Sequence, residues 1–135
     1  MSKKPVVIDF HAHSMTQAVF DATYERSVLG QIRSQVGGAV RPLPDHLLQR
    51  MINLDLRLAD MDRMGVDVQV VSPNILHQCT YAEDPAEGLR LERLNNDYMA
   101  ELVSKAPDRL IGIASVPLQD AGLAIQELER AVLDL

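Results

Sequence analysis

Residues 5–13 read Pro5-Val-Val-Ile-Asp-Phe-His-Ala-His13, an apolar run that ends in two histidines separated by one small residue. Side chains alternate between the two faces of a strand, so we expect His11 and His13 to project from the same face. The pattern predicts a strand over residues 6–10 with both imidazoles at its carboxyl end. In a parallel α/β fold, that end of the strands carries the chemistry, and the histidine pair therefore marks a candidate site.

Two more strands are predicted by short apolar runs rich in β-branched residues, over residues 66–72 and 110–116. Their nearly continuous apolar character fits strands that are covered on both faces, as in parallel sheets. A helical pattern follows each of the three strands. The order β-α-β-α-β-α predicts an α/β fold whose parallel strands are joined by right-handed crossovers.

The helix predictions rest on apolar residues three or four apart and on signals at the helix ends. One helix is expected over residues 45–64, with Gly65 ending it in a left-handed turn. A second helix begins after Asp84, which can cap it, and cannot continue through Pro107. A third helix is expected after Asp120, another capping residue.

Residues 14–44 are long for a connection between a strand and a helix. They contain Gly37-Gly38 and Pro42-x-Pro44, so we expect an irregular insertion here. Three βα units of about 45 residues each imply about 360 residues for eight, within the range of (β/α)₈ barrels. We therefore expect residues 1–135 to be the N-terminal part of a single (β/α)₈ barrel domain, with a complete small α/β domain as the alternative.

The composition excludes some classes of partner. The chain has 13 basic and 19 acidic residues and a net charge of −6, without a basic stripe, which argues against nucleic acid. No apolar run approaches the length of a membrane span, and no signal-peptide pattern precedes the first strand. We therefore expect a cytoplasmic protein without a membrane partner. Cys79 is the only cysteine, so no disulfide can form within the chain.

His11 and His13 could hold a metal ion, because neutral imidazole is a good ligand for zinc, iron, manganese and nickel. The alternative is that they are two polar residues entering a loop. Asp9 has the same parity along the strand and is expected on the same face. Its carboxylate could orient an imidazole, or it could bond to neighbouring backbone and side chains.

Three further residues are candidates for contact with a substrate. Asn74 and His77 follow the second predicted strand and would lie at the same edge of the sheet as the histidine pair. Arg41 lies in the irregular stretch above that edge, where a guanidinium could hold a carboxylate. The alternative for both His77 and Arg41 is an ordinary solvated side chain.

Four segments together resemble the amidohydrolase-related proteins, most closely the branch of aminocarboxymuconate semialdehyde decarboxylase, which also holds the γ-resorcylate and 5-carboxyvanillate decarboxylases. The segments are Ile8-Asp-Phe-His-Ala-His13, Met61-Asp-Arg-Met-Gly-Val-Asp-Val-Gln-Val-Val-Ser72, Leu94-Asn-Asn-Asp97 and Pro107-Asp-Arg-Leu-Ile-Gly-Ile-Ala-Ser-Val-Pro-Leu-Gln-Asp120. The resemblance covers most of the chain except the stretch from residue 14 to about residue 50.

The resemblance implies a metal-dependent (β/α)₈ TIM-type barrel with one divalent metal ion, Zn²⁺ in preference to Mn²⁺, for which His11 and His13 supply two ligands. It implies a decarboxylase (a C–C lyase) of small unsaturated or aromatic carboxylic acids, with catalytic residues beyond Leu135. One alternative is a metal-dependent hydrolase of the same fold that acts on a lactone, an amide or a C–C bond. Another is a non-catalytic fragment that lacks the remaining ligands. The expected partners are a small carboxylate substrate and a second copy in a homodimer.

Overall fold

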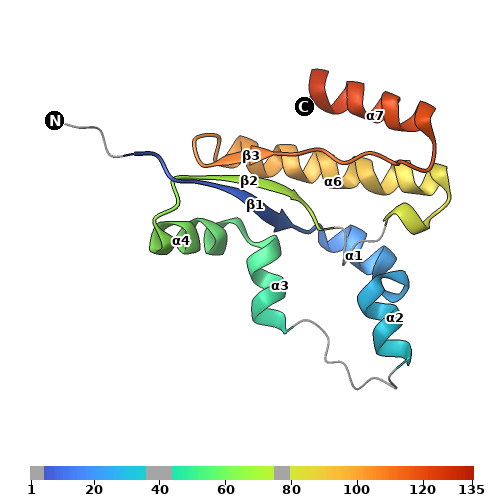
Figure 1. The fold of residues 1–135 in the computed structure, drawn as a ribbon, viewed down its shortest axis with the longest axis horizontal. Coiled ribbons are helices and arrows are strands. Elements are labelled where there is room, and N and C mark those ends of the chain that lie inside the picture. The colour runs from blue at the N-terminus through green and yellow to red at the C-terminus, as the bar shows by residue number, and fades with distance from the viewer. Residues whose placement is uncertain (1–4, 36–43, 75–79) are drawn as a thin grey trace.

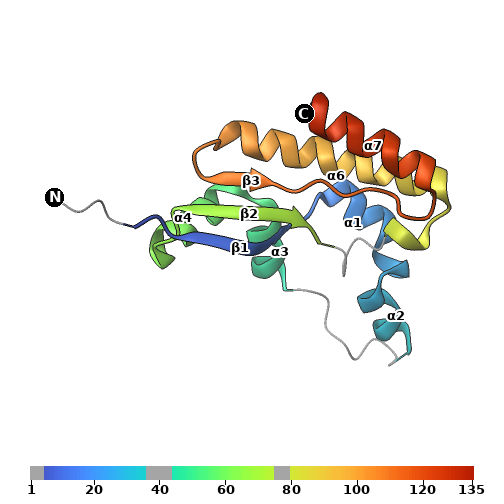
Figure 2. The ribbon, with the colours of Figure 1, turned by 45° about the horizontal axis from the view of Figure 1, so that its top comes forward.

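The structure, a computed structural model, describes residues 5–35, 44–74 and 80–135. Three strands, β1 (Ile8–Ser14), β2 (Val68–Pro73) and β3 (Leu110–Gly112), form one sheet in the order β1-β2-β3, and both pairings are parallel. Figure 2 shows the strands side by side in this order. The predicted α/β class and parallel strand order are confirmed.

The largest differences from the predicted strand bounds, four residues each, lie at the carboxyl ends of β1 and β3. β1 continues to Ser14, so both histidines lie within the strand rather than after it. β3 ends at Gly112 instead of residue 116, although the N–H of Ile113 still donates to the carbonyl of Val71 at 2.8 Å. The chain then leaves the sheet, because the N–H of Ser115 donates to the side chain of Asn96 rather than to a strand.

The helix expected over residues 45–64 is two helices, α3 (Asp45–Ile52) and α4 (Leu54–Met64). They are separated by Asn53, whose backbone is extended and whose side chain accepts a hydrogen bond from the N–H of Leu56 at 3.1 Å. Asparagine offers the backbone an alternative to the helical ladder, which explains the break. Gly65 ends α4 with φ 72°, as predicted.

Two other helices begin where the capping signals predict. Asp84 caps α6 (Pro85–Lys105) by accepting hydrogen bonds from two backbone N–H groups of its first turn. Asp120 caps α7 (Ala121–Leu133) by accepting one from the N–H of Leu123. Figure 1 shows α7 lying beside α6, and the two helices are in contact.

The prediction of an irregular insertion over residues 14–44 is wrong for most of its described part. This part forms α1 (Gln17–Thr23), the 3-10 helix η1 (Tyr24–Arg26) and α2 (Val28–Gln35). Burial of Val19 and Thr23 in α1, which contacts α6, explains why the segment is ordered as helix. The glycine pair and the proline pair that suggested irregularity lie largely outside the described residues.

The core lies between one face of the sheet and helices α4 and α6. Its buried side chains form one cluster, Met61, Val71, Met99, Leu102, Ala106 and Leu110. On the opposite face of the sheet, Ile111 remains 51% exposed. None of the helices in the described ranges is long and apolar enough to cross a membrane.

Candidate metal-binding site

A bulge in β1 determines which side chains face the same way. Asp9 pairs with Gln69 and Ala12 pairs with Val71, so two residues of β1 oppose the single residue Val70. The extra residue reverses the alternation beyond it. Since Gln69 lies on the same face as the core residue Val71, Asp9 points toward the helices. The prediction that Asp9 shares the face of the histidines is therefore wrong.

The two histidine side chains meet on the face away from the helices. His13 pairs with Ser72 of β2, and the ring of His11 lies 4.9 Å from the ring of His13, with the ring planes at 82°. The Nδ1 atom of His13 is 3.0 Å from the hydroxyl oxygen of Ser72. If Nδ1 carries the proton and donates to that hydroxyl, Nε2 keeps its lone pair free to bind a metal.

The donor set at this position fits a divalent transition metal. Two neighbouring imidazoles are suitable ligands, but catalytic zinc sites usually have three protein ligands. Within residues 5–35, 44–74 and 80–135, no group of three or more His, Cys, Asp and Glu side chains is arranged to hold an ion. The described residues therefore offer two imidazoles suited to a metal and not a complete coordination sphere.

A second set of polar contacts lies on the helix side of the same strand. Arg57 of α4, only 8% exposed, donates to the carbonyl oxygen of His13 at 2.6 Å and to the side-chain oxygen of Gln69 at 2.6 Å. The Gln69 amide donates to Asp9 at 2.9 Å, and Asp9 also accepts from the N–H of His11 at 3.1 Å. These bonds from Gln69 and His11 lower the pKa of Asp9, and burial lowers the pKa of Arg57.

The sequence did not identify Ser72, Gln69 or Arg57 as residues of the site. The positions of Arg57 and Gln69 in the hydrophobic pattern nevertheless indicate that their side chains are buried. Arg57 lies three residues after Leu54 and four before Met61, so a charged side chain stands within the apolar stripe of the helix. Gln69 stands between the apolar residues Val68 and Val70 and on the same face as Val71. A polar residue in a position that the pattern buries indicates that it has specific partners.

Of the three residues predicted to contact a substrate, Asn74 lies within the described part of the chain. Asn74 is buried at the carboxyl end of β2, where its N–H donates to the carbonyl of Ser14 at 3.0 Å and its amide lies 4.0 Å from the sulfur of Met51. Its contact with a substrate stays a prediction. Arg41 and His77 lie outside the described residues, so their proposed roles stay predictions as well.

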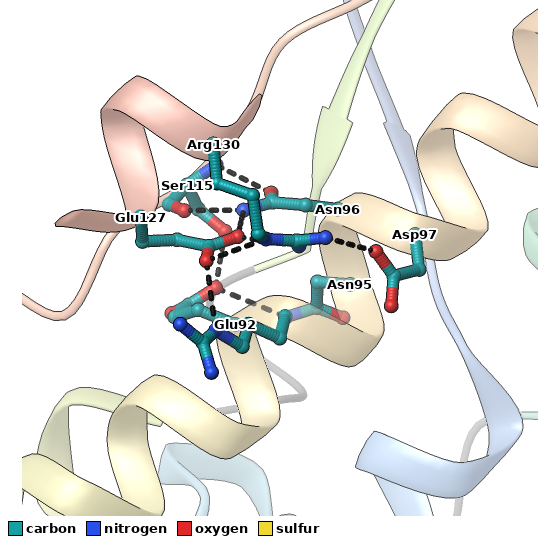
Figure 3. A network of polar contacts seen from close by, with 8 residues as sticks. Glu92, Asn95, Asn96, Asp97, Ser115, Glu127 and Arg130 are labelled. Carbon is teal, nitrogen blue, oxygen red and sulfur yellow. Dashed lines mark hydrogen bonds and ion pairs between the residues drawn. The ribbon is translucent and has the colours of Figure 1, made fainter. Parts of the chain in front are cut away.

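The loops at the carboxyl ends of all three strands are tied to α6 through Glu92. This buried carboxylate accepts hydrogen bonds from Thr80, which follows β2, from Ser115, which follows β3, and from Asn95. Asn95 in turn accepts from the hydroxyl of Thr16, which follows β1. Figure 3 shows Glu92, Asn95 and Ser115 in this arrangement. One hydrogen-bonded network thus connects α6 to the segments that follow β1, β2 and β3, at the edge of the sheet that carries the histidines.

Glu127 continues this polar network onto α7 (Figure 3). Its carboxylate is fully buried and accepts from Asn96 at 2.7 Å, from Arg130 at 2.7 and 2.9 Å, and from Arg93 at 3.1 Å. Burial alone would raise the pKa of Glu127, but the hydrogen bonds from Arg130, Asn96 and Arg93 outweigh it and lower the pKa. Bonds to Glu127 and Asp97 raise the pKa of Arg130.

Comparison with known proteins finds an amidohydrolase family model and similar proteins that are named as decarboxylases. The family model described as amidohydrolase matches residues 8–135. A 2-amino-3-carboxymuconate-6-semialdehyde decarboxylase of Dictyostelium discoideum is 38% identical over 81 residues, which cover 60% of this chain and 22% of the relative. A gamma-resorcylate decarboxylase of Rhizobium radiobacter is 36% identical over 90 residues, which cover 66% of this chain and 27% of the relative.

A solved structure shares the fold and contains a metal. The 5-carboxyvanillate decarboxylase of Novosphingobium aromaticivorans, complexed with manganese and 4-hydroxy-3-methoxy-5-nitrobenzoic acid, matches with a TM-score of 0.78 and 26% identity. The match covers 96% of this chain and 39% of that chain. The chain thus spans about a quarter of the length of the two curated relatives above, and its three βα units have the fold of such decarboxylases, as predicted.

Proposed function

Because the chain belongs to the amidohydrolase family, as the sequence resemblance indicated, we propose that it contributes to a metal-dependent decarboxylase of small aromatic or unsaturated carboxylic acids. The observation that carries the proposal is the contact of the His11 and His13 rings on the face of a parallel sheet that lies opposite α4 and α6. Relatives named as decarboxylases support the reaction class. Since the chain covers only part of those relatives, the activity is proposed for the protein as its gene encodes it.

In this proposal, His11 and His13 hold one divalent cation. A cation at this position supplies Lewis-acid stabilisation of the negative charge that develops as CO₂ leaves the substrate. Imidazole donors favour zinc, whereas the 5-carboxyvanillate decarboxylase structure contains manganese, so metal analysis of the purified protein decides between the two. Further ligands have to come from outside the described residues, because these residues offer only two.

Other residues of this chain orient the ligands and the substrate. The Ser72 hydroxyl oxygen lies where it can accept a hydrogen bond from the Nδ1–H of His13 and so hold the ring in one tautomer. We assign Asn74, Arg41 and His77 to substrate binding, with Arg41 as the partner of the substrate carboxylate. A cytoplasmic location and a homodimer belong to the proposal as well, and both rest on the sequence and the resemblance.

The test measures CO₂ release from gamma-resorcylate and 5-carboxyvanillate by the purified gene product. We expect release to stop on chelation, to return with added Zn²⁺ or Mn²⁺, and to fall at least about 100-fold in His11→Ala and His13→Ala. His46→Ala is the matched control, because His46 is an exposed histidine on α3, and it should retain activity.

Three outcomes would contradict a metal-dependent decarboxylase. Release that persists without metal would exclude the proposed mechanism. Hydrolysis of a lactone, an amide or a C–C bond without CO₂ release would instead support a hydrolase of the same fold. A gene product that binds metal but converts none of these compounds would favour a non-catalytic role.

A further inference from the structure

We propose that Arg57 is a positioning residue for the two histidines. From the helix side of the sheet, its guanidinium holds the bulged part of β1 in the shape that brings the imidazoles together on the other side. The inference rests on the proposed function in one respect, because it treats the histidine pair as metal ligands. It assigns a role to a buried arginine whose hydrogen bonds go to the carbonyl of His13 and to the side chain of Gln69.

The hydrogen bonds around Arg57 form a path from one histidine backbone to the other. The path starts at the carbonyl oxygen of His13, which accepts from Arg57, and passes from Arg57 to the side chain of Gln69. It continues from the Gln69 amide to the carboxylate of Asp9 and ends at the N–H of His11. Two of the contacts are at 2.6 Å, the others at 2.9 and 3.1 Å. Each bond ends on a backbone group or on a side chain that points toward the helices.

Because β1 contains a bulge, these hydrogen bonds can determine its register against β2. A bulge interrupts the regular ladder, and the direction of the side chains beyond it depends on where the extra residue lies. If β1 slipped by one residue against β2, His13 would turn toward the helices and the ring contact would be lost. Arg57 opposes such a slip, because it holds the His13 carbonyl relative to Gln69, which pairs with Asp9 on the other side of the bulge.

An arginine at position 57 suits the positioning role better than it would suit packing in the core alone. A buried guanidinium costs stability unless its donors are satisfied, and a leucine or methionine would fit the apolar stripe of α4 without that cost. The planar fork of arginine donates in two fixed directions at once, here to a backbone carbonyl and to an amide oxygen. Lysine has no such fork, so it is expected to replace only one of the two bonds.

Arg109 provides a matched control. It also donates to backbone carbonyls, those of Asp67 at 2.8 Å and Val66 at 3.1 Å, but at the amino end of the sheet. Replacing Arg57 by methionine removes two hydrogen bonds, and replacing Arg109 removes three, because Arg109 also pairs with Asp62 at 2.8 Å. Only the first replacement should affect the histidine pair.

The first measurement is amide hydrogen exchange on the protein as its gene encodes it, which needs neither metal nor substrate. In Arg57→Met, the segment that contains β1 should exchange about tenfold faster or more than in the wild type. In Arg109→Met, the faster exchange should be confined to the amino end of β2 and the preceding turn. Equal exchange of β1 in the two variants would overturn the inference.

The second measurement is the affinity for Zn²⁺ and for Mn²⁺, obtained by competition with a chelating dye. Arg57→Met should bind about 10- to 100-fold more weakly than the wild type, the range seen when groups that orient metal ligands are removed. The affinity of Arg57→Lys should fall between those of the wild type and Arg57→Met. The affinity of Arg109→Met should stay within about twofold of the wild type. If Arg57→Met does not fold, Gln69→Met cuts the same path and should weaken binding by about tenfold.

The outcomes separate this inference from the proposed function. Wild-type affinity in a folded Arg57→Met or Gln69→Met variant would overturn the positioning role and leave the decarboxylase intact. A wild-type protein that binds neither cation would contradict the proposed function, and the exchange experiment would then decide by itself whether Arg57 holds the bulge.

Discussion

Replacing Glu127 by glutamine should destabilise the protein, because its buried carboxylate accepts four hydrogen bonds from three side chains. One carboxylate oxygen accepts from Asn96 and from one nitrogen of Arg130, and the other accepts from Arg93 and from a second nitrogen of Arg130. In Glu127→Gln, an amide NH₂ group takes the place of one oxygen. Whichever way the amide is oriented, two of the four donors that bonded to the carboxylate then face the NH₂ group, which is itself a donor and cannot accept their hydrogen bonds.

The size of the effect follows from the two bonds that are lost. Hydrogen bonds to charged groups contribute about 1.5–3 kcal/mol each, so the loss would be at least about 3 kcal/mol if both donors remained dry. Arg93 and Arg130 are 40% and 25% exposed, so water can satisfy part of their freed donors. We therefore expect the free energy of unfolding to fall by about 2–3 kcal/mol at pH 7.

The same network predicts how the effect changes with pH. The pKa of Glu127 is lower in the folded protein than its ordinary value of 4.5, so the carboxylate contributes stability above that value. This contribution is lost as the pH falls through the lowered folded-state pKa. Glutamine does not titrate, so the difference between the wild type and Glu127→Gln should be constant above about pH 5.5 and shrink in acid.

Urea unfolding of both proteins at several pH values measures this difference. Glu129→Gln is the control, because Glu129 is exposed on the same helix, and it should change the unfolding free energy by less than about 0.5 kcal/mol. A loss below about 0.5 kcal/mol in Glu127→Gln, or a difference that does not shrink in acid, would refute the reasoning.

Three other substitutions test the site and the fold. Ser72→Ala should weaken binding of Zn²⁺ by about tenfold, because it removes the partner of His13 Nδ1; unchanged affinity in a chelator competition would contradict this. Gly112→Ala should lower the unfolding free energy by about 1–3 kcal/mol, since the added Cβ would lie 2.7 Å from the side chain of Met99. Asn53→Ala should cost about 1 kcal/mol in the same urea assay through loss of the α4 cap, and an unchanged midpoint would show that the cap is dispensable.

Local signals in the sequence were sufficient for much of the fold. Asp84, Asp120 and Gly65 mark helix ends through bonds and dihedral angles within a few residues, so the sequence alone located these ends. The positions of the three strands followed from short apolar runs for the same reason. The contact of the two histidine rings also agrees with their local spacing of two residues, although His11 is itself one of the two residues of the bulge.

The remaining features depend on contacts between distant segments. The bulge in β1 exists only in the pairing of Asp9 and Ala12 with residues about 60 positions away, so alternation along one strand placed Asp9 on the wrong face. Within residues 17–35, α1 packs against α6 and α2 packs against η1, and no local pattern reveals the contact with α6. The roles of Arg57 and Glu92 likewise appear only when their partners are brought together.

The central claim is that His11 and His13 bind one divalent cation together. Diffraction from crystals of the gene product at the absorption edges of zinc and manganese tests it directly. We expect one anomalous peak per chain, about 2.0–2.3 Å from a ring nitrogen of each histidine. A peak elsewhere, or next to only one of the two rings, would show that His11 and His13 do not bind one cation together.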